Sequence, residues 1–143
     1  MNVEIIRQDW ESLAGRRHRF SADFYRRLFE RHPHFRRLFP DEMGPQSERM
    51  VEMLSHVARF ADHIDLIRPY LVNVGFAHRR MGISKTDVED FLATMLESLS
   101  EACGGFDSTH TEAWREVLND TIAPLFEDGL ETGRGQAGKP ASG

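Results

Sequence analysis

The sequence predicts an all-α fold, and two features of it support that prediction. Apolar residues recur every three or four positions along most of the chain, the spacing that places them on one face of an α-helix. No segment shows the alternation of apolar and polar residues that is typical of a half-buried β-strand. The 143 residues are enough for one compact domain whose core needs neither a disulfide nor a metal.

The N-terminal part of the chain divides at prolines. The apolar pattern of residues 6–13 predicts a first helix. The pattern of residues 20–29 predicts a second helix, which ends before Pro33 because a proline ring disfavours helix at the residue that precedes it. A short segment follows over residues 35–39, and the stretch 40–45, with its two prolines and a glycine, is expected to be a loop.

The middle of the chain predicts two further helices. Apolar residues within 50–61 share one face of a long helix. Those within 67–78 share one face of the next, and Pro69 lies in its first turn, where a proline is tolerated. Gly82 is then expected to end that helix.

The C-terminal part begins with a helix-capping signal. The run 84–87, Ser-Lys-Thr-Asp, predicts the start of a helix that carries the apolar pattern of 88–103. The last helix is expected to start at Ser108, and Pro124 should kink it or end its regular part. Residues 132–143 are rich in glycine, serine, lysine and proline, so a disordered tail is expected after a folded domain of residues 1–131.

Composition and charge argue against several roles. The net charge of −5 argues against a nucleic-acid partner. No apolar stretch is long enough to cross a bilayer and no signal segment is evident, so no membrane partner and a cytoplasmic location are expected. The single cysteine, Cys103, cannot form an internal disulfide, and its place on an apolar helix stripe predicts a buried small side chain.

His78 differs from the other histidines because it lies on the apolar face of its helix, in register with Leu71 and Val74. Taken alone, such a histidine is more often a core residue with a satisfied ring than a ligand. Zinc is not supported, since no set of cysteines and histidines with ligand spacing surrounds it. The chain also lacks the Cys-x-x-Cys-His motif that attaches haem covalently.

An ordered set of motifs extends across residues 20–126. In chain order it comprises Phe24-Tyr25-Arg26-Arg27-Leu28-Phe29, His32-Pro33, Leu38-Phe39, Gln46, Pro69, His78-Arg79-Arg80-Met81-Gly82-Ile83 and Trp114. Phe39 is 14 residues after Tyr25, and His78 is 32 residues after Gln46. In order and spacing this set resembles the bacterial single-domain haemoglobins and the haem domain of flavohaemoglobins. The resemblance implies a globin fold, with helices packed around a haem pocket.

On the proximal side, the resemblance implies that His78 is the iron ligand of a non-covalently bound haem b. Its other ring nitrogen is expected to donate a hydrogen bond to a backbone carbonyl one turn earlier, near Val74. Phe39 is expected to stack on the haem edge, although it is equally well described as a core aromatic residue.

On the distal side, the resemblance implies that Tyr25 and Gln46 face the bound ligand. A phenol and an amide can both hydrogen-bond to the partial negative charge of bound oxygen, whereas carbon monoxide accepts such bonds poorly. Two alternatives stay open: Tyr25 is tied to a neighbouring backbone group, or Gln46 is only a helix-start residue.

The remaining implied haem contacts are apolar, and three arginines are candidates for the haem propionates. The apolar contacts are Met50, Leu54, Val74, Ile83, Phe91 and Met95, and the arginines are Arg49, Arg79 and Arg80. Solvent exposure is the alternative for each arginine. Flavohaemoglobin haem domains also carry a tyrosine and a glutamate that polarise the proximal histidine. An ungapped alignment places Val88 and Gly129 at those positions, which weakens the case for oxidative chemistry.

These residues predict a globin that reversibly binds oxygen or another diatomic gas such as nitric oxide or carbon monoxide. Whether it is also an enzyme is left open by the sequence. One alternative is nitric oxide dioxygenation or a peroxidase-like reaction, either of which needs an external reductase. Two others are a haem-based sensor and a haem-free helical interaction module. The sequence does not predict an oligomeric state.

Overall fold

The structure is a computed structural model that describes residues 2–79, 82–124 and 127. Every regular element within those ranges is helical, and none is a strand. The α-helices are α1 (Val3–Ser12), α2 (Arg17–Arg31), α3 (Gly44–Arg59), α4 (Arg68–Arg79), α5 (Lys85–Ala102) and α6 (Ser108–Arg115). Shorter helical segments are η1 (Pro33–Leu38), η2 (Ile64–Leu66) and η3 (Glu116–Ile122). The predicted all-α class is confirmed.

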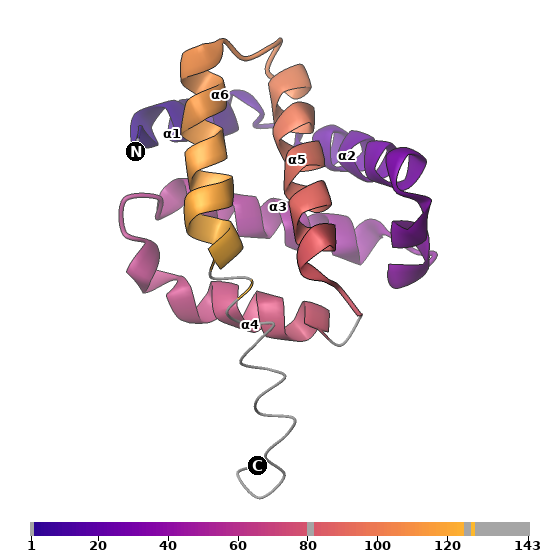
Figure 1. Cartoon of the computed structure of the whole chain (residues 1–143). Coiled ribbons are helices and arrows are strands. Elements are labelled where there is room, and N and C mark those ends of the chain that lie inside the picture. The colour runs from indigo at the N-terminus through magenta and orange to yellow at the C-terminus, as the bar shows by residue number, and fades with distance from the viewer. Residues whose placement is uncertain (1, 80–81, 125–126, 128–143) are drawn as a thin grey trace, which may run out of the picture.

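The helices pack across one another rather than in a parallel bundle. In Figure 1, α5 and α6 lie next to each other at the front, α3 crosses behind them, and α4 lies along the lower edge. α2 packs on both α3 and α5, and α1 packs on both α3 and α6. The core between these helices is apolar. Its largest fully buried side chains include Trp114, Phe24, Phe35, Leu54, Leu71, Met95 and Leu99.

The helix ends near α4 and α5 follow the sequence signals. Ser84 caps α5: its hydroxyl accepts a hydrogen bond from the Asp87 backbone N–H, and the Asp87 carboxylate accepts one from the Ser84 N–H, both at 3.1 Å. Gly82, between α4 and α5, has φ +81°, which a residue with a side chain rarely adopts. Pro69 lies in the first turn of α4, as predicted.

Two boundaries differ from the expectation. The loop predicted over 40–45 is shorter, because α3 begins at Gly44 and includes Pro45 in its first turn. A proline is compatible with that turn, since its missing N–H would have no helical partner there. The short segment predicted over 35–39 is a 3-10 helix, η1, which begins at Pro33. η2 was not predicted, because three residues are too few to show a period.

The last helix loses its regular geometry before Pro124. The α-helical hydrogen bonding ends at Arg115, and η3 continues as a π-helix. Proline has no N–H to donate, and its ring crowds the carbonyl four residues earlier, here that of Asp120. The wider π turn relieves that conflict. The prediction that Pro124 kinks the helix or ends its regular part is consistent with this geometry.

Some predictions lie outside the described residues. They concern the side chain of Arg79, and Arg80, Gly129 and the tail 132–143. Within the described part of the chain, none of the helices has the length and apolar character needed to span a bilayer.

Candidate functional site

The main candidate site is a largely apolar cavity of about 350 Å³ bounded by α2, α3, α4 and α5. That volume is in the range of small-molecule and cofactor sites, about 300–1,000 Å³. Eight of the residues predicted from the sequence line it: Tyr25, Phe39, Gln46, Met50, Val74, His78, Ile83 and Phe91. The fold therefore brings together residues that are up to 66 positions apart in the sequence, from Tyr25 to Phe91.

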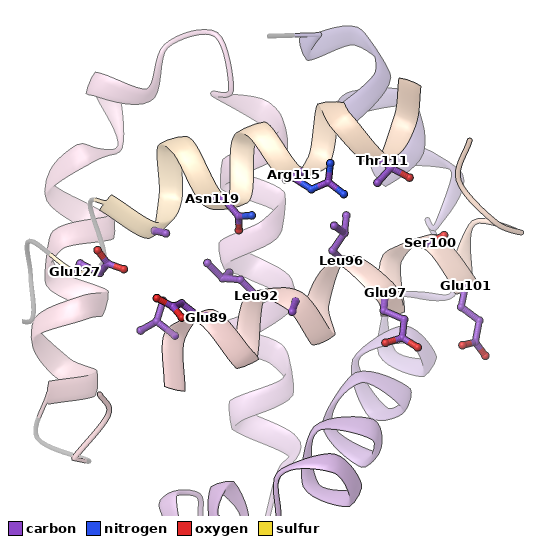
Figure 2. A pocket seen from close by; sticks show the side chains of 13 residues that line it. Glu89, Leu92, Leu96, Glu97, Ser100, Glu101, Thr111, Arg115, Asn119 and Glu127 are labelled. Atoms are coloured by element: carbon purple, nitrogen blue, oxygen red, sulfur yellow. The ribbon is translucent and has the colours of Figure 1, made fainter. Parts of the chain in front are cut away.

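Two larger grooves are less suitable for an apolar cofactor because they are open and charged. The first, of about 730 Å³, lies between α5 and the last helix. Figure 2 shows Glu97, Glu101 and Arg115 beside it. The second, of about 640 Å³, lies between α1 and α3 and is lined by charged residues that include Arg7 and Arg17. Neither groove contains His78.

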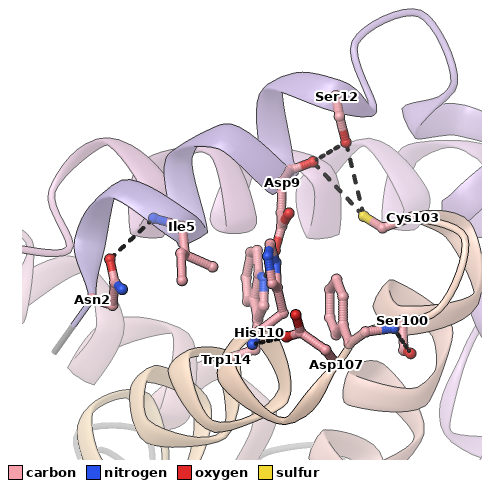
Figure 3. Close-up of polar contacts among 10 residues, drawn as sticks. Asn2, Ile5, Asp9, Ser12, Ser100, Cys103, Asp107, His110 and Trp114 are labelled. Atoms are coloured by element: carbon pink, nitrogen blue, oxygen red, sulfur yellow. Dashed lines mark hydrogen bonds and ion pairs between the residues drawn. The ribbon is translucent and has the colours of Figure 1, made fainter.

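A buried polar cluster lies apart from the cavity and joins α1 to α6 (Figure 3). The Asp9 carboxylate accepts hydrogen bonds from Nδ1 of His110 at 2.7 Å and from Nε1 of Trp114 at 2.9 Å. Cys103 lies at the edge of this cluster, with its Sγ 3.8 Å from the Asp9 carbonyl oxygen. Cys103 is only half-buried at the C-terminal cap of α5, so the prediction of a buried small side chain was wrong.

His78 lies near the C-terminal end of α4 and lines the cavity. Its Nδ1 lies 2.7 Å from the carbonyl oxygen of Val74, one turn earlier, which is the hydrogen bond expected from the sequence. Burial lowers the pKa of the His78 imidazole, and the bond to Val74 partly offsets this. The neutral ring therefore dominates at pH 7. With Nδ1 donating to Val74, its lone pair is on Nε2, the arrangement that suits a metal ligand.

The described residues do not build a three-ligand metal site around His78. Among the described residues, no three His, Cys, Asp or Glu side chains converge on one metal position. A porphyrin supplies four nitrogens to its iron, so a single protein imidazole matches that chemistry.

Tyr25 enters the cavity from α2 and is almost completely buried. Its hydroxyl has no hydrogen-bond partner among the described residues, so the alternative in which a described backbone group ties it down is not observed. Burial raises the pKa of Tyr25 to about 12, although the nearby Gln46 amide and the Arg49 charge act in the opposite direction. The Gln46 amide is thus close to the phenol without completing a hydrogen bond to it.

Gln46 lies in the first turn of α3 and is half-buried against the cavity. The N-cap residue is Met43, whose side chain makes no capping hydrogen bond, and the Gly44 N–H of the first turn donates instead to Oε1 of Glu42 at 3.0 Å. Neither feature gives Gln46 a capping role. Its Oε1 accepts a hydrogen bond from Nη1 of Arg49 at 3.4 Å. Both Gln46 and Arg49 line the cavity, and Arg49 is otherwise exposed.

Aromatic side chains form one wall of the cavity. The rings of Tyr25 and Phe39 meet edge to face, with centroids 5.5 Å apart. Phe91 meets the ring of Phe24, a core residue outside the cavity lining, in the same way at 4.9 Å. Phe39 is buried in the core and also lines the cavity, so both descriptions given from the sequence apply. Val88 is buried and also lines the cavity, where it offers no polar group.

Two residues predicted to contact the haem do not line the cavity, and several residues that were not predicted do. Leu54 and Met95 are fully buried in the core but do not line the cavity. The sequence analysis did not select Phe35, Glu52, Met53, Tyr70, Asp87, Leu92 or Ile122, which do line it. Helical spacing could have indicated Met53 and Leu92, which follow Met50 and Val88 by one turn. No local signal indicates Tyr70 of α4, whose ring meets that of His56 of α3 edge to face with centroids 5.2 Å apart.

Comparison with known proteins identifies the family. The family model described as Globin matches residues 22–125. The chain belongs to the globin family. Globins have a fold that binds haem and gaseous ligands. The His78 imidazole and the Tyr25 phenol, which has no hydrogen-bond partner among the described residues, fit a haem with a ligand beside it.

Relatives of this globin include larger proteins. The flavohemoprotein of Halalkalibacterium halodurans is 26% identical over 130 residues, which cover 86% of this chain and 31% of the relative. The flavohemoprotein of Bacillus cereus is 24% identical over 127 residues, with 87% and 31% covered. This globin thus spans about a third of the length of these relatives. The neuroglobin of Dissostichus mawsoni is 22% identical over 149 residues, 94% of each chain.

Solved structures show the same fold. A bacterial globin from Campylobacter jejuni superposes with a TM-score of 0.81 at 20% identity, over 91% of this chain and 94% of the other. An engineered carbene transferase, made from a candidate nitric oxide dioxygenase of Rhodothermus marinus, gives a TM-score of 0.84 at 22% identity, over 96% of each chain. The predicted globin fold is confirmed.

Proposed function

We propose that this globin holds one haem b without a covalent bond, with His78 as the iron ligand, and reversibly binds oxygen. The observation that supports this most strongly is the pairing of two groups across one apolar cavity. His78 presents a neutral imidazole oriented by Val74, and Tyr25 carries a buried hydroxyl with no partner among the described residues. A buried unpaired hydroxyl is destabilising by about 1–3 kcal/mol, so its presence beside a cavity suggests a ligand that completes it.

When bound, haem supplies an iron that holds a diatomic gas and draws negative charge onto it. The chain's own residues then decide which gas is held longest. The Tyr25 hydroxyl and the Gln46 amide N–H donate hydrogen bonds to a ligand atom that carries negative charge. Phe39 and Met50 exclude water from the same space, which strengthens those bonds. These hydrogen bonds stabilise bound oxygen, which carries negative charge, and stabilise bound carbon monoxide much less.

The test compares two gases in one variant. Tyr25→Phe removes the hydroxyl and keeps the ring, so oxygen release should become about 10-fold faster or more, since a hydrogen bond to a charged group contributes about 1.5–3 kcal/mol. Carbon monoxide release should change by much less. Flash photolysis and stopped-flow mixing measure both rates. Equal acceleration of the two gases would show that the phenol acts by bulk or access rather than by hydrogen bonding.

Nitric oxide dioxygenation with an external reductase is a second candidate, because two relatives are flavohemoproteins and one structural neighbour derives from a candidate nitric oxide dioxygenase. The apolar Val88 counts against it, since it offers no hydrogen bond toward the proximal side. Stopped-flow mixing of the oxygen-bound form with nitric oxide, followed by repeated turnover with a flavin reductase and nicotinamide, distinguishes the two. Sustained turnover would favour the enzyme, and a single turnover would favour the gas binder.

A further inference from the structure

The open groove of about 730 Å³ between α5 and α6, here called the α5–α6 groove, has an apolar middle and an acidic rim (Figure 2). One wall is a row of α5 side chains that follow one another at intervals of one turn: Glu89, Ala93, Glu97 and Glu101. Since a helix rises 1.5 Å per residue, this row is about 18 Å long. Ala93 is exposed and Leu96 is half-buried in the middle of the groove. The groove thus offers an apolar strip with carboxylates at both ends.

The charge of the groove lining is strongly one-sided. Its charged groups are four carboxylates and one guanidinium, those of Glu89, Glu97, Glu101, Glu127 and Arg115. The guanidinium of Arg115 already pairs with Glu112 at 2.6 Å, and Glu112 does not line the groove. Arg115 therefore leaves the rim acidic.

The two ends of the groove differ in how their carboxylates are compensated. Glu97 and Glu101 each pair with an arginine of α2. Glu89 and Glu127 lie at the opposite end in Figure 2, and no ion pair formed within the described part of the chain includes either of them. The end at Glu89 and Glu127 is thus where the fold leaves negative charge without a partner.

We infer that the α5–α6 groove is a docking site for a basic helix of a partner protein. Lysine or arginine side chains of that helix meet Glu89 and Glu127, and its small apolar side chains pack on Ala93 and Leu96. A helix laid in a groove presents side chains at one-turn intervals, the same spacing as the α5 wall. The inference is independent of the proposed function, because none of these contacts involves haem.

Charge distinguishes this partner from two other occupants. A second copy of the chain that docks through the same groove places like charges opposite each other, which disfavours the contact. The chain's own residues 128–143 contain two basic residues, Arg134 and Lys139, and two acidic ones, Asp128 and Glu131, so this segment carries no net positive charge. A basic partner complements the rim better than either.

The test uses the full chain as purified and a synthetic helical peptide of alanine, leucine and lysine as the probe. The peptide has about 14 residues, enough to follow the α5 wall, with its lysines one turn apart. A peptide with glutamate in place of lysine is the probe control. Binding is followed by the backbone amide NMR shifts of the isotope-labelled chain, which locate the contact and give the Kd.

Two variants separate charge from shape. Glu89→Gln/Glu127→Gln removes the two unpaired carboxylates, and Ala93→Gln fills the middle of the groove without changing the charge. Glu48→Gln/Asp65→Asn is the matched control for the first, because both residues are exposed, form no ion pair among the described residues and lie outside the groove.

The lysine peptide should bind the wild-type chain and shift amides of α5 and α6 that border the groove, and the glutamate peptide should not bind. Glu89→Gln/Glu127→Gln should weaken binding of the lysine peptide about 10-fold, the scale expected for loss of two exposed charge contacts. Ala93→Gln should also weaken it, and the control double variant should leave the Kd unchanged. Binding should weaken as ionic strength rises, because salt screens exposed charges.

The inference is overturned if the lysine peptide does not bind, if its shifts map elsewhere, or if Ala93→Gln binds it as the wild-type chain does. An equal loss in the control double variant would also overturn it, by showing a general effect of net charge. Tighter binding by Arg134→Gln/Lys139→Gln would assign the groove to the chain's own C-terminal segment instead. A dimer in sedimentation velocity that Ala93→Gln dissociates would assign it to a second copy.

Discussion

Tyr25→Phe should make the haem-free protein more stable, which is unusual for a change at a buried position. The substitution removes one oxygen atom and keeps the ring contacts with Phe24 and Phe39, whose ring centroids lie 4.8 Å and 5.5 Å from that of Tyr25. The removed hydroxyl is buried and has no partner among the described residues. Leaving such a group unpaired is destabilising by about 1–3 kcal/mol, so its removal should raise the free energy of unfolding by about 1–2 kcal/mol. For a chain of this size that corresponds to roughly 3–8 °C in Tm.

Urea unfolding of the haem-free protein, followed by circular dichroism at 222 nm, measures this free energy. Tyr70→Phe is the matched control, since the Tyr70 side chain is only half-buried and its hydroxyl is not among the buried unpaired atoms. It should change stability by less than about 0.5 kcal/mol. If Tyr25→Phe is less stable than the wild-type chain, the phenol has a partner in the folded protein, and the argument that it awaits a ligand fails.

The polar cluster between α1 and α6 yields two further predictions. Asp9→Ala should lower the free energy of unfolding by about 2–4 kcal/mol, because it leaves the N–H of the fully buried Trp114 unpaired and removes the partner of His110. Asp23→Ala, which breaks an exposed ion pair, should change it by less than about 0.5 kcal/mol in the same denaturation experiment. The hydrogen bond to Asp9 raises the pKa of His110 in the folded state. The charged form of His110 should therefore add to the free energy of unfolding, relative to His110→Asn, and this contribution is complete below the unfolded pKa of about 6.5. The contribution should disappear as the pH rises through the raised pKa of the folded state.

Equal losses in Asp9→Ala and Asp23→Ala would show that the buried Trp114 contact contributes nothing specific. A stability difference between wild-type and His110→Asn that stays constant from pH 6 to pH 9 would contradict the assignment of a raised pKa to His110.

Much of the fold is encoded locally, which is why it can be predicted from the sequence. Apolar spacing and the Ser84 capping box locate α5, and the bond between His78 and Val74 follows from their separation of one helical turn. The π-helical form of η3 could be anticipated only in part. Pro124 signals a disturbance, but packing decides whether a helix bends, stops or widens.

The composition of the cavity wall is less predictable because it depends on contacts between distant segments. Tyr70 lines the cavity because of how α4 approaches α3, and nothing in its own neighbourhood indicates this. The contact between the Asp87 carboxylate and Nε2 of His34 joins residues 53 positions apart. Leu54 has the correct helical spacing for the cavity but faces the core. Periodicity identifies the buried face of a helix, and only the three-dimensional packing shows which part of that face borders a cavity.

Haem titration of wild-type protein and His78→Gly, with and without free imidazole, tests the central claim most directly. The wild-type chain should take up one haem with a sharp Soret band. His78→Gly should lose that band or bind haem with a changed ferrous spectrum, and imidazole should restore the wild-type spectrum by replacing the missing ring. A His78→Gly protein with an unchanged ferrous spectrum, or a wild-type chain that binds no haem, would contradict the account.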